Sequence, residues 1–117
     1  MSGAVAEQFC YLTTTGRVSG SPHTIEIWFA LQGETAYLLS GDRDRSDWVR
    51  NLMVMPDVVL KIGERRHAAR ARVLDEGRPG DVEARRLLLE KYQHAGGEDL
   101  AGWGRTALAV AIGPIQP

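Results

Sequence analysis

The chain has 117 residues, a formal net charge of −1, 44% hydrophobic residues and 25% charged residues, which is typical of one soluble globular domain. No apolar run approaches the roughly 20 residues that a membrane-spanning helix needs, and the balanced charge argues against a general nucleic-acid-binding protein. We therefore expect a single domain, residues 1–117, with no membrane span and no nucleic-acid partner.

The first residues give no sign of export. The segment 1–7 lacks the basic start and apolar core of a signal peptide, so a cytoplasmic protein is expected. The only cysteine, Cys10, has no partner for an internal disulfide, and its apolar neighbours predict a buried side chain.

The N-terminal third predicts three strands. Residues 8–15 are rich in aromatic and β-branched residues, and the loop 16–21 then forms the turn of a hairpin. The next strand, 23–31, alternates, with His23, Ile25, Ile27, Phe29 and Leu31 on one face. A third strand, Thr35–Ser40, follows a short turn.

A short helix is predicted after the third strand. Ser46 is suited to the N-cap position, and Val49, Leu52 and Met53 form an apolar stripe at helical spacing. Pro56 prevents the helix from continuing.

The C-terminal half predicts two paired strands, a longer helix and a last strand. The paired strands are 57–62 and 65–74, and in the second of them alanines alternate with Arg70 and Arg72. The longer helix begins at Pro79 and ends at Gly96-Gly97, while Gly102 and Gly104 indicate a turn. The last strand is 106–112.

Six strands joined by mostly hairpin-length links predict a mainly β, α+β fold, in which an antiparallel sheet curls into a small barrel with one short and one longer helix. A doubly wound parallel sheet is not expected, because it needs a crossover helix between most strands. The three histidines have no partners at metal-ligand spacing, so no metal site is predicted.

An arginine-rich segment precedes the predicted short helix. Arg43 and Arg45 come just before Ser46, and Trp48 falls in the first turn. Amides at a helix start and guanidinium groups both bind phosphate, and an indole offers a flat apolar face. These residues predict a phosphate site beside a ring-binding surface, as a nucleotide-like or flavin-like cofactor requires. Because aspartates alternate with the arginines, a solvated surface loop is the alternative.

Six short stretches follow one another along the chain in a characteristic order. They are Leu-Thr-Thr-Thr-Gly-Arg-x-Ser-Gly-x-Pro at residues 12–22, Trp28-Phe29, Ser40-Gly41, Trp48-x-x-Asn51-Leu52, Pro56-Asp57-Val58 and Trp103-Gly104-Arg105-Thr106. Together they resemble the deazaflavin-dependent nitroreductase and quinone reductase family. That family belongs to the split β-barrel group, which includes the flavin-dependent pyridoxamine phosphate oxidases.

The resemblance implies a six-stranded split β-barrel that binds the deazaflavin coenzyme, factor 420. Its phosphate-bearing tail is expected in the loop and helix after the third strand, and its ring system beside the second strand. The implied cofactor-binding residues are Ser40, Gly41, Arg43, Arg45, Ser46, Trp48 and Asn51 for the tail, with Ile25, Ile27 and Trp28 near the ring. In such proteins the reduced coenzyme delivers hydride to a quinone, a nitroaromatic or another small conjugated acceptor, while the protein supplies binding and orientation. No catalytic residue is assigned.

The sequence also departs from the family pattern. His23 stands where the family usually has Arg or Lys, and the segment between Ser40 and Trp48 is shorter than in the nitroreductases. These departures point toward the more oxidase-like branch, in which two subunits usually share the cofactor sites, so a homodimer is expected.

Two alternatives stay open. Flavin mononucleotide (FMN) would satisfy the same arginines through its one phosphate. A non-enzymatic carrier would use the same barrel to hold a cofactor or metabolite without turnover, because one fold hosts unrelated functions.

Overall fold

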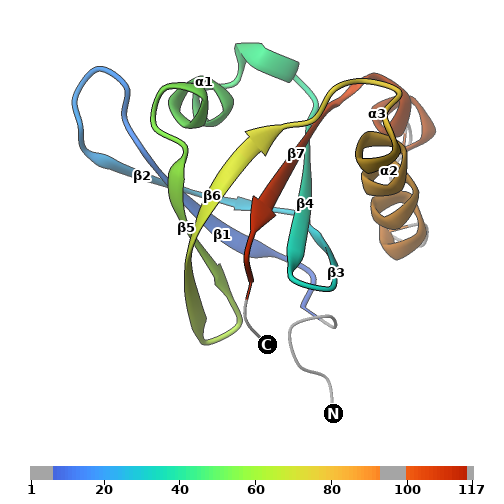
Figure 1. Cartoon of the computed structure of the whole chain (residues 1–117), viewed down its shortest axis with the longest axis horizontal. Coiled ribbons are helices and arrows are strands. Elements are labelled where there is room, and N and C mark those ends of the chain that lie inside the picture. The colour runs from blue at the N-terminus through green and yellow to red at the C-terminus, as the bar shows by residue number, and fades with distance from the viewer. Residues whose placement is uncertain (1–6, 93–99, 116–117) are drawn as a thin grey trace.

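The computed structural model describes residues 7–92 and 100–115, and its strands form one antiparallel sheet in the order β2-β1-β5-β6-β7-β4-β3. The sheet curls into a half-open barrel (Figure 1). The strands are β1 Cys10–Thr15, β2 Pro22–Ile27, β3 Ala30–Gln32, β4 Thr35–Ser40, β5 Asp57–Ile62, β6 Arg65–Val73 and β7 Leu108–Gly113.

This part of the chain has seven strands where the sequence predicted six, because the predicted strand 23–31 is broken at Trp28 and Phe29. The Phe29 amide donates to the hydroxyl of Tyr92 at 3.0 Å, and the Phe29 carbonyl accepts from Lys91 Nζ at 2.9 Å. The indole of Trp28 stacks on the Tyr92 ring at 4.1 Å. Backbone groups that would extend the ladder are thus bound by α2 (Pro79–Tyr92), which alternation of apolar residues cannot reveal.

The other predicted strands are confirmed, with small shifts at their ends. The third and fourth have the predicted bounds, and β6 ends one residue earlier than predicted. Along β6 the alanines Ala69 and Ala71 are buried whereas Arg70 and Arg72 are exposed, as their alternation predicted. The last strand begins two residues later than predicted, at Leu108.

The predicted short helix is α1, Asp47–Val54. Val49 and Leu52 are buried as predicted, but Met53 is 59% exposed because it lies on the solvent side of the helix. Ser46 occupies the N-cap position, although its hydroxyl makes no capping bond to the helix.

A third helix, α3 (Leu100–Thr106), was not predicted, and the proposed turn at Gly102 and Gly104 lies within it. Two glycines in seven residues weaken the helical signal. Gly104 packs closely on α2, since a Cβ there would lie 2.8 Å from two methyl groups of Leu89, and that side chain would have to shift to admit it. The predicted helix end at Gly96-Gly97 falls outside the described residues.

Two apolar cores hold the layers together. The first fills the barrel, where inward-facing residues of the strands meet Leu52 of α1. The second lies between the outer face of β4 and β7 and the helix pair α2 and α3, which stand side by side against that face (Figure 1). Helix α1 covers one end of the barrel beside the hairpin of β1 and β2. Among the described residues, no helix is long and apolar enough to span a membrane.

Candidate cofactor-binding site

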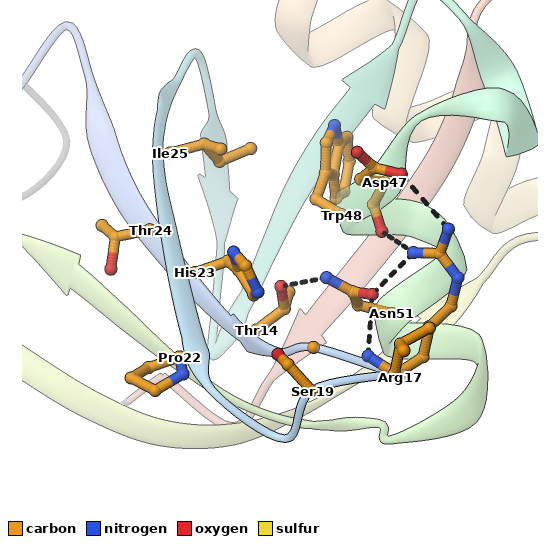
Figure 2. Close-up of a pocket in the computed structure, with 12 residues that line it drawn as sticks. Thr14, Arg17, Ser19, Pro22, His23, Thr24, Ile25, Asp47, Trp48 and Asn51 are labelled. Carbon is orange, nitrogen blue, oxygen red and sulfur yellow. Dashed lines mark hydrogen bonds and ion pairs between the residues drawn. The ribbon is translucent and has the colours of Figure 1, made fainter.

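A pocket of about 630 Å³ lies between the β1–β2 hairpin and α1. One wall is the hairpin loop and the first half of β2, and the other is the first turns of α1 (Figure 2). The lining residues are Thr14, Gly16, Arg17, Val18, Ser19, Pro22, His23, Thr24, Ile25, Asp47, Trp48 and Asn51.

Arg17 connects the two walls. Its amide and its Nη1 donate to Asn51 Oδ1 at 3.1 and 2.8 Å, and its Nη2 is 3.2 Å from Asp47 Oδ1. Asn51, only 4% exposed, donates in turn to Thr14 Oγ1 at 3.2 Å. This network fixes one cationic group at the pocket surface (Figure 2).

The start of α1 adds a second source of positive potential. Its first helical backbone bond runs from the Arg50 amide to the Ser46 carbonyl at 3.0 Å. The amides of residues 47–49 therefore lie ahead of the intrahelical ladder, where a helix carries about half a positive charge. Asp47 and Trp48 of this first turn both line the pocket.

The apolar part of the pocket comes from Trp48 and Ile25. Both are half-buried and pack against the barrel core. His23 and Ile25 point from β2 toward α1, whereas Thr24 points away from it (Figure 2). The His23 ring closes over Gly16, where a Cβ would lie 2.7 Å from its Nε2. The pocket thus combines a flat apolar surface with a cation and a helix start.

Of the residues predicted for the coenzyme tail, Trp48 and Asn51 line this pocket, and three others form a separate cluster. Ser40 Oγ lies 2.8 Å from Ser46 Oγ and donates to the Arg43 carbonyl at 2.8 Å. The Arg43 guanidinium binds the Thr106 carbonyl and Glu76 Oε1, at 2.5 and 2.6 Å. These contacts connect the turn before α1 to the end of α3.

The remaining predicted residues lie outside the pocket lining. Arg45 and Gly41 are exposed in the turn before α1, and within the described part of the chain the Arg45 side chain has no hydrogen bond or ion pair. Ile27 packs on the barrel core and Trp28 on the core beneath α2. Whether these residues bind cofactor stays a prediction.

Arg17 and Asp47 are lining residues that the sequence analysis did not select. The Gly16-Arg17 step belongs to the first of the six stretches that carry the resemblance, so a signal for Arg17 was present. Its contact with Asn51, 34 positions away, depends on how the hairpin folds over α1. Within residues 7–92 and 100–115, no group of three or more His, Cys, Asp or Glu side chains is arranged to hold a metal ion.

The family model for F420H2-dependent quinone reductases matches residues 3–110. The chain belongs to this family. F420H2 is the reduced form of factor 420, so the deazaflavin coenzyme that the resemblance implied is confirmed at the level of the family. The match is to a reductase family, which favours a reductase over the oxidase-like branch.

Solved structures of similar shape confirm the split-barrel fold of this F420H2-dependent quinone reductase family member. An F420H2-dependent reductase, FDR-A, is 18% identical over 91% of this chain and 94% of its own, with a TM-score of 0.74. An F420 reductase is 18% identical over 98% and 93%, with a TM-score of 0.67. HutZ, a haem storage protein from Vibrio cholerae, is 16% identical over 97% and 86%, with a TM-score of 0.77. A search of curated protein sequences gives no match.

The pocket of this family member has the chemistry that a deazaflavin coenzyme requires. The indole of Trp48 offers a surface for a planar ring, and Arg17 with the first amides of α1 offers donors for a phosphate. Thr14, Ser19 and His23 add hydrogen-bonding groups along the same wall. The residues present therefore fit the coenzyme.

Proposed function

We propose that this F420H2-dependent reductase transfers hydride to a small conjugated acceptor, such as a quinone or a nitroaromatic. The observation that supports it is the family match over residues 3–110, together with a pocket in which Trp48 and Arg17 line the same space. The acceptor class comes from the family and from the apolar surface that Trp48 and Ile25 offer within the pocket.

In this proposal each wall of the pocket has its own task. Arg17 and the amides of α1 bind the phosphate-bearing part of the coenzyme, while Trp48 and Ile25 hold the ring and exclude water from one side of it. Asn51 positions Arg17, because its Oδ1 accepts from both the amide and the guanidinium of that residue. The bound coenzyme supplies the hydride, and the protein supplies orientation and electrostatics.

Two measurements on the purified full chain test the proposal. Fluorescence titration with oxidised F420 and, separately, with FMN measures which cofactor binds. Oxidation of F420H2, followed by the return of its visible absorbance, measures turnover with a panel of quinones and nitroaromatics. We expect F420 to bind at micromolar concentration and oxidation to depend on acceptor.

Each alternative gives a different result. Binding of FMN without F420 contradicts the coenzyme assignment, and tight F420 binding with no oxidation by any acceptor supports a carrier. A Trp48→Ala variant should weaken binding, because it removes the largest apolar side chain of the pocket. Met53→Ala on the exposed side of α1 is the matched control and should bind like the wild type.

We further propose that the protein is a homodimer that meets its partner on the exposed face of β6. Arg70 and Arg72 project from this face beside a hollow of about 550 Å³, which also contains Thr35 and Gly113. One solved structure of the same fold, 18% identical, is described as a domain-swapped dimer. Sedimentation at micromolar concentration tests the proposal, and a 12.9 kDa particle would contradict it.

A further inference from the structure

Asp47 is an acidic side chain in a pocket that is otherwise suited to an anion. Its carboxylate lies 3.2 Å from Arg17 Nη2, and its backbone carbonyl accepts from Arg17 Nη1 at 3.5 Å. Figure 2 shows both contacts between Arg17 and Asp47 at the start of α1. The carboxylate thus occupies a position from which Arg17 would otherwise bind a ligand anion.

The two partners of Arg17 differ in how firmly they are held. Asn51 is 4% exposed and is also bound to Thr14, so its contact with Arg17 is part of the packed structure. The side chain of Asp47 is 85% exposed, and exposed ion pairs contribute little stability. A ligand anion can therefore displace the carboxylate from Arg17 without disturbing Asn51.

We propose that Asp47 sets the charge selectivity of the pocket by competing with the anionic part of the ligand for Arg17. This inference rests on the proposed function. A ligand with a phosphate must displace the carboxylate or lie beside it, and both cost affinity. A ligand without the phosphate meets no such competition. Asp47 therefore lowers the affinity for a ligand that carries a phosphate and leaves the affinity for the same ring system without the phosphate unchanged.

The expected effect follows from the charges involved. A carboxylate within about 5 Å of a phosphate at a solvated surface opposes it by roughly 1 kcal/mol, which corresponds to about fivefold in affinity. Asp47→Asn keeps the size of the side chain and removes the charge. We expect it to raise the affinity for F420 about three- to tenfold, and to leave the affinity for the deazaflavin chromophore without its phosphate tail unchanged.

Asp44→Asn is the matched control. Asp44 is three positions away and exposed, and it does not line the pocket, so its loss changes the net charge equally. Fluorescence titration of wild type, Asp47→Asn and Asp44→Asn with the two ligands, at low and at high salt, measures the effect. The gain for Asp47→Asn should shrink at high salt, because ions screen exposed charges.

A second readout needs no coenzyme. Modification by phenylglyoxal, followed residue by residue with mass spectrometry, reports how available each guanidinium is. The proposal expects faster modification of Arg17 in Asp47→Asn than in Asp44→Asn, with Arg105 as an internal reference.

The outcomes separate the inference from the proposed function. Equal gains for both ligands, equal gains in both variants, or no gain at all would overturn the role of Asp47 while leaving F420 binding intact. If the wild type does not bind F420, the proposed function fails, and an unchanged modification rate of Arg17 then also overturns the inference.

Discussion

The hydroxyl of Tyr92 is the group on which the break between β2 and β3 depends, and Tyr92→Phe tests this. The hydroxyl accepts from the Phe29 amide at 3.0 Å and lies 2.6 Å from the Gln8 carbonyl, to which it donates. Burial raises the pKa of Tyr92 to about 12, so the hydroxyl remains a donor at physiological pH. The hydroxyl also lies 2.9 Å from the Phe29 carbonyl. Phenylalanine keeps the stack on Trp28 and removes these hydroxyl contacts.

The expected cost comes mainly from one buried donor. Phe29 is fully buried, so its amide finds no replacement partner in water, and an unsatisfied buried donor costs about 1–3 kcal/mol. The Phe29 carbonyl keeps its bond from Lys91. We therefore expect Tyr92→Phe to lower the free energy of unfolding by about 2 kcal/mol. For a chain of 117 residues this lowers Tm by about 8 °C, at about 2.1 cal/mol/K of unfolding entropy per residue.

Urea and thermal unfolding, followed by tryptophan fluorescence, measure the loss. Tyr11→Phe is the control, because that hydroxyl donates to Glu26 on the exposed outer face of the sheet and should matter by less than about 0.5 kcal/mol. A Tyr92→Phe protein as stable as Tyr11→Phe would refute the claim that α2 holds the strand break.

Three further predictions concern the pocket and the charges. Arg17→Ala should weaken F420 binding at least about tenfold. The loss should exceed that of the Arg43→Ala/Arg45→Ala double variant, because of these three arginines only Arg17 lines the pocket. Fluorescence titration compares the two variants. Asp81→Asn should lower the free energy of unfolding, measured in urea, by about 3 kcal/mol. The reason is that Arg85 on α2, which is nearly buried and lies 2.9 Å from the Asp81 carboxylate, loses its counter-charge. Burial lowers the pKa of His67 below its usual value of 6.5, and the positive charge of Arg65 lowers it further. Between the two pKa values the unfolded chain binds a proton at His67 that the folded chain does not. The wild type should therefore lose stability as pH falls through 6.5 toward the lower pKa of the folded state. His67→Gln should lose less stability over the same pH range, as unfolding titrations measure.

Each of these has a contradicting result. A larger affinity loss in the double variant than in Arg17→Ala would support the phosphate clamp before α1 that the sequence predicted. An unchanged urea midpoint in Asp81→Asn would show that the ion pair contributes nothing. Parallel pH profiles for wild type and His67→Gln would mean that His67 titrates alike in the folded and unfolded chain.

The sequence predicted most of the sheet because period-two alternation survives wherever a strand has one buried face. The pattern of alanine and arginine on β6 is the clearest example. The prediction from alternation failed at Phe29, because its backbone is bound by the side chain of Tyr92, 63 positions away. The sequence prediction failed again at α3, where Gly104 lies close against Leu89 of α2 and lowers the helical propensity of the segment.

The candidate site was predicted in part for the same reason. Trp48 and Asn51 share a helix with the predicted anion-binding start, so local pattern was sufficient to select them. Local pattern did not show that the Arg43 guanidinium is bound by Glu76 and Thr106. Nor did it show that the hairpin folds Arg17 over α1, because both facts depend on contacts between distant segments.

Strand β2 lies at the edge of the sheet, and among the strands that the structure describes it pairs with β1 alone. It is fastened at both of its ends, by Arg17 and Asn51 near the hairpin loop and by Tyr92 at the break that follows Ile27. Of these two attachments, the contact with Tyr92 involves no residue that lines the pocket. We therefore expect that loosening the Tyr92 contact would change the width of the space in front of Trp48 through the backbone of β2, although no residue that lines the pocket is altered.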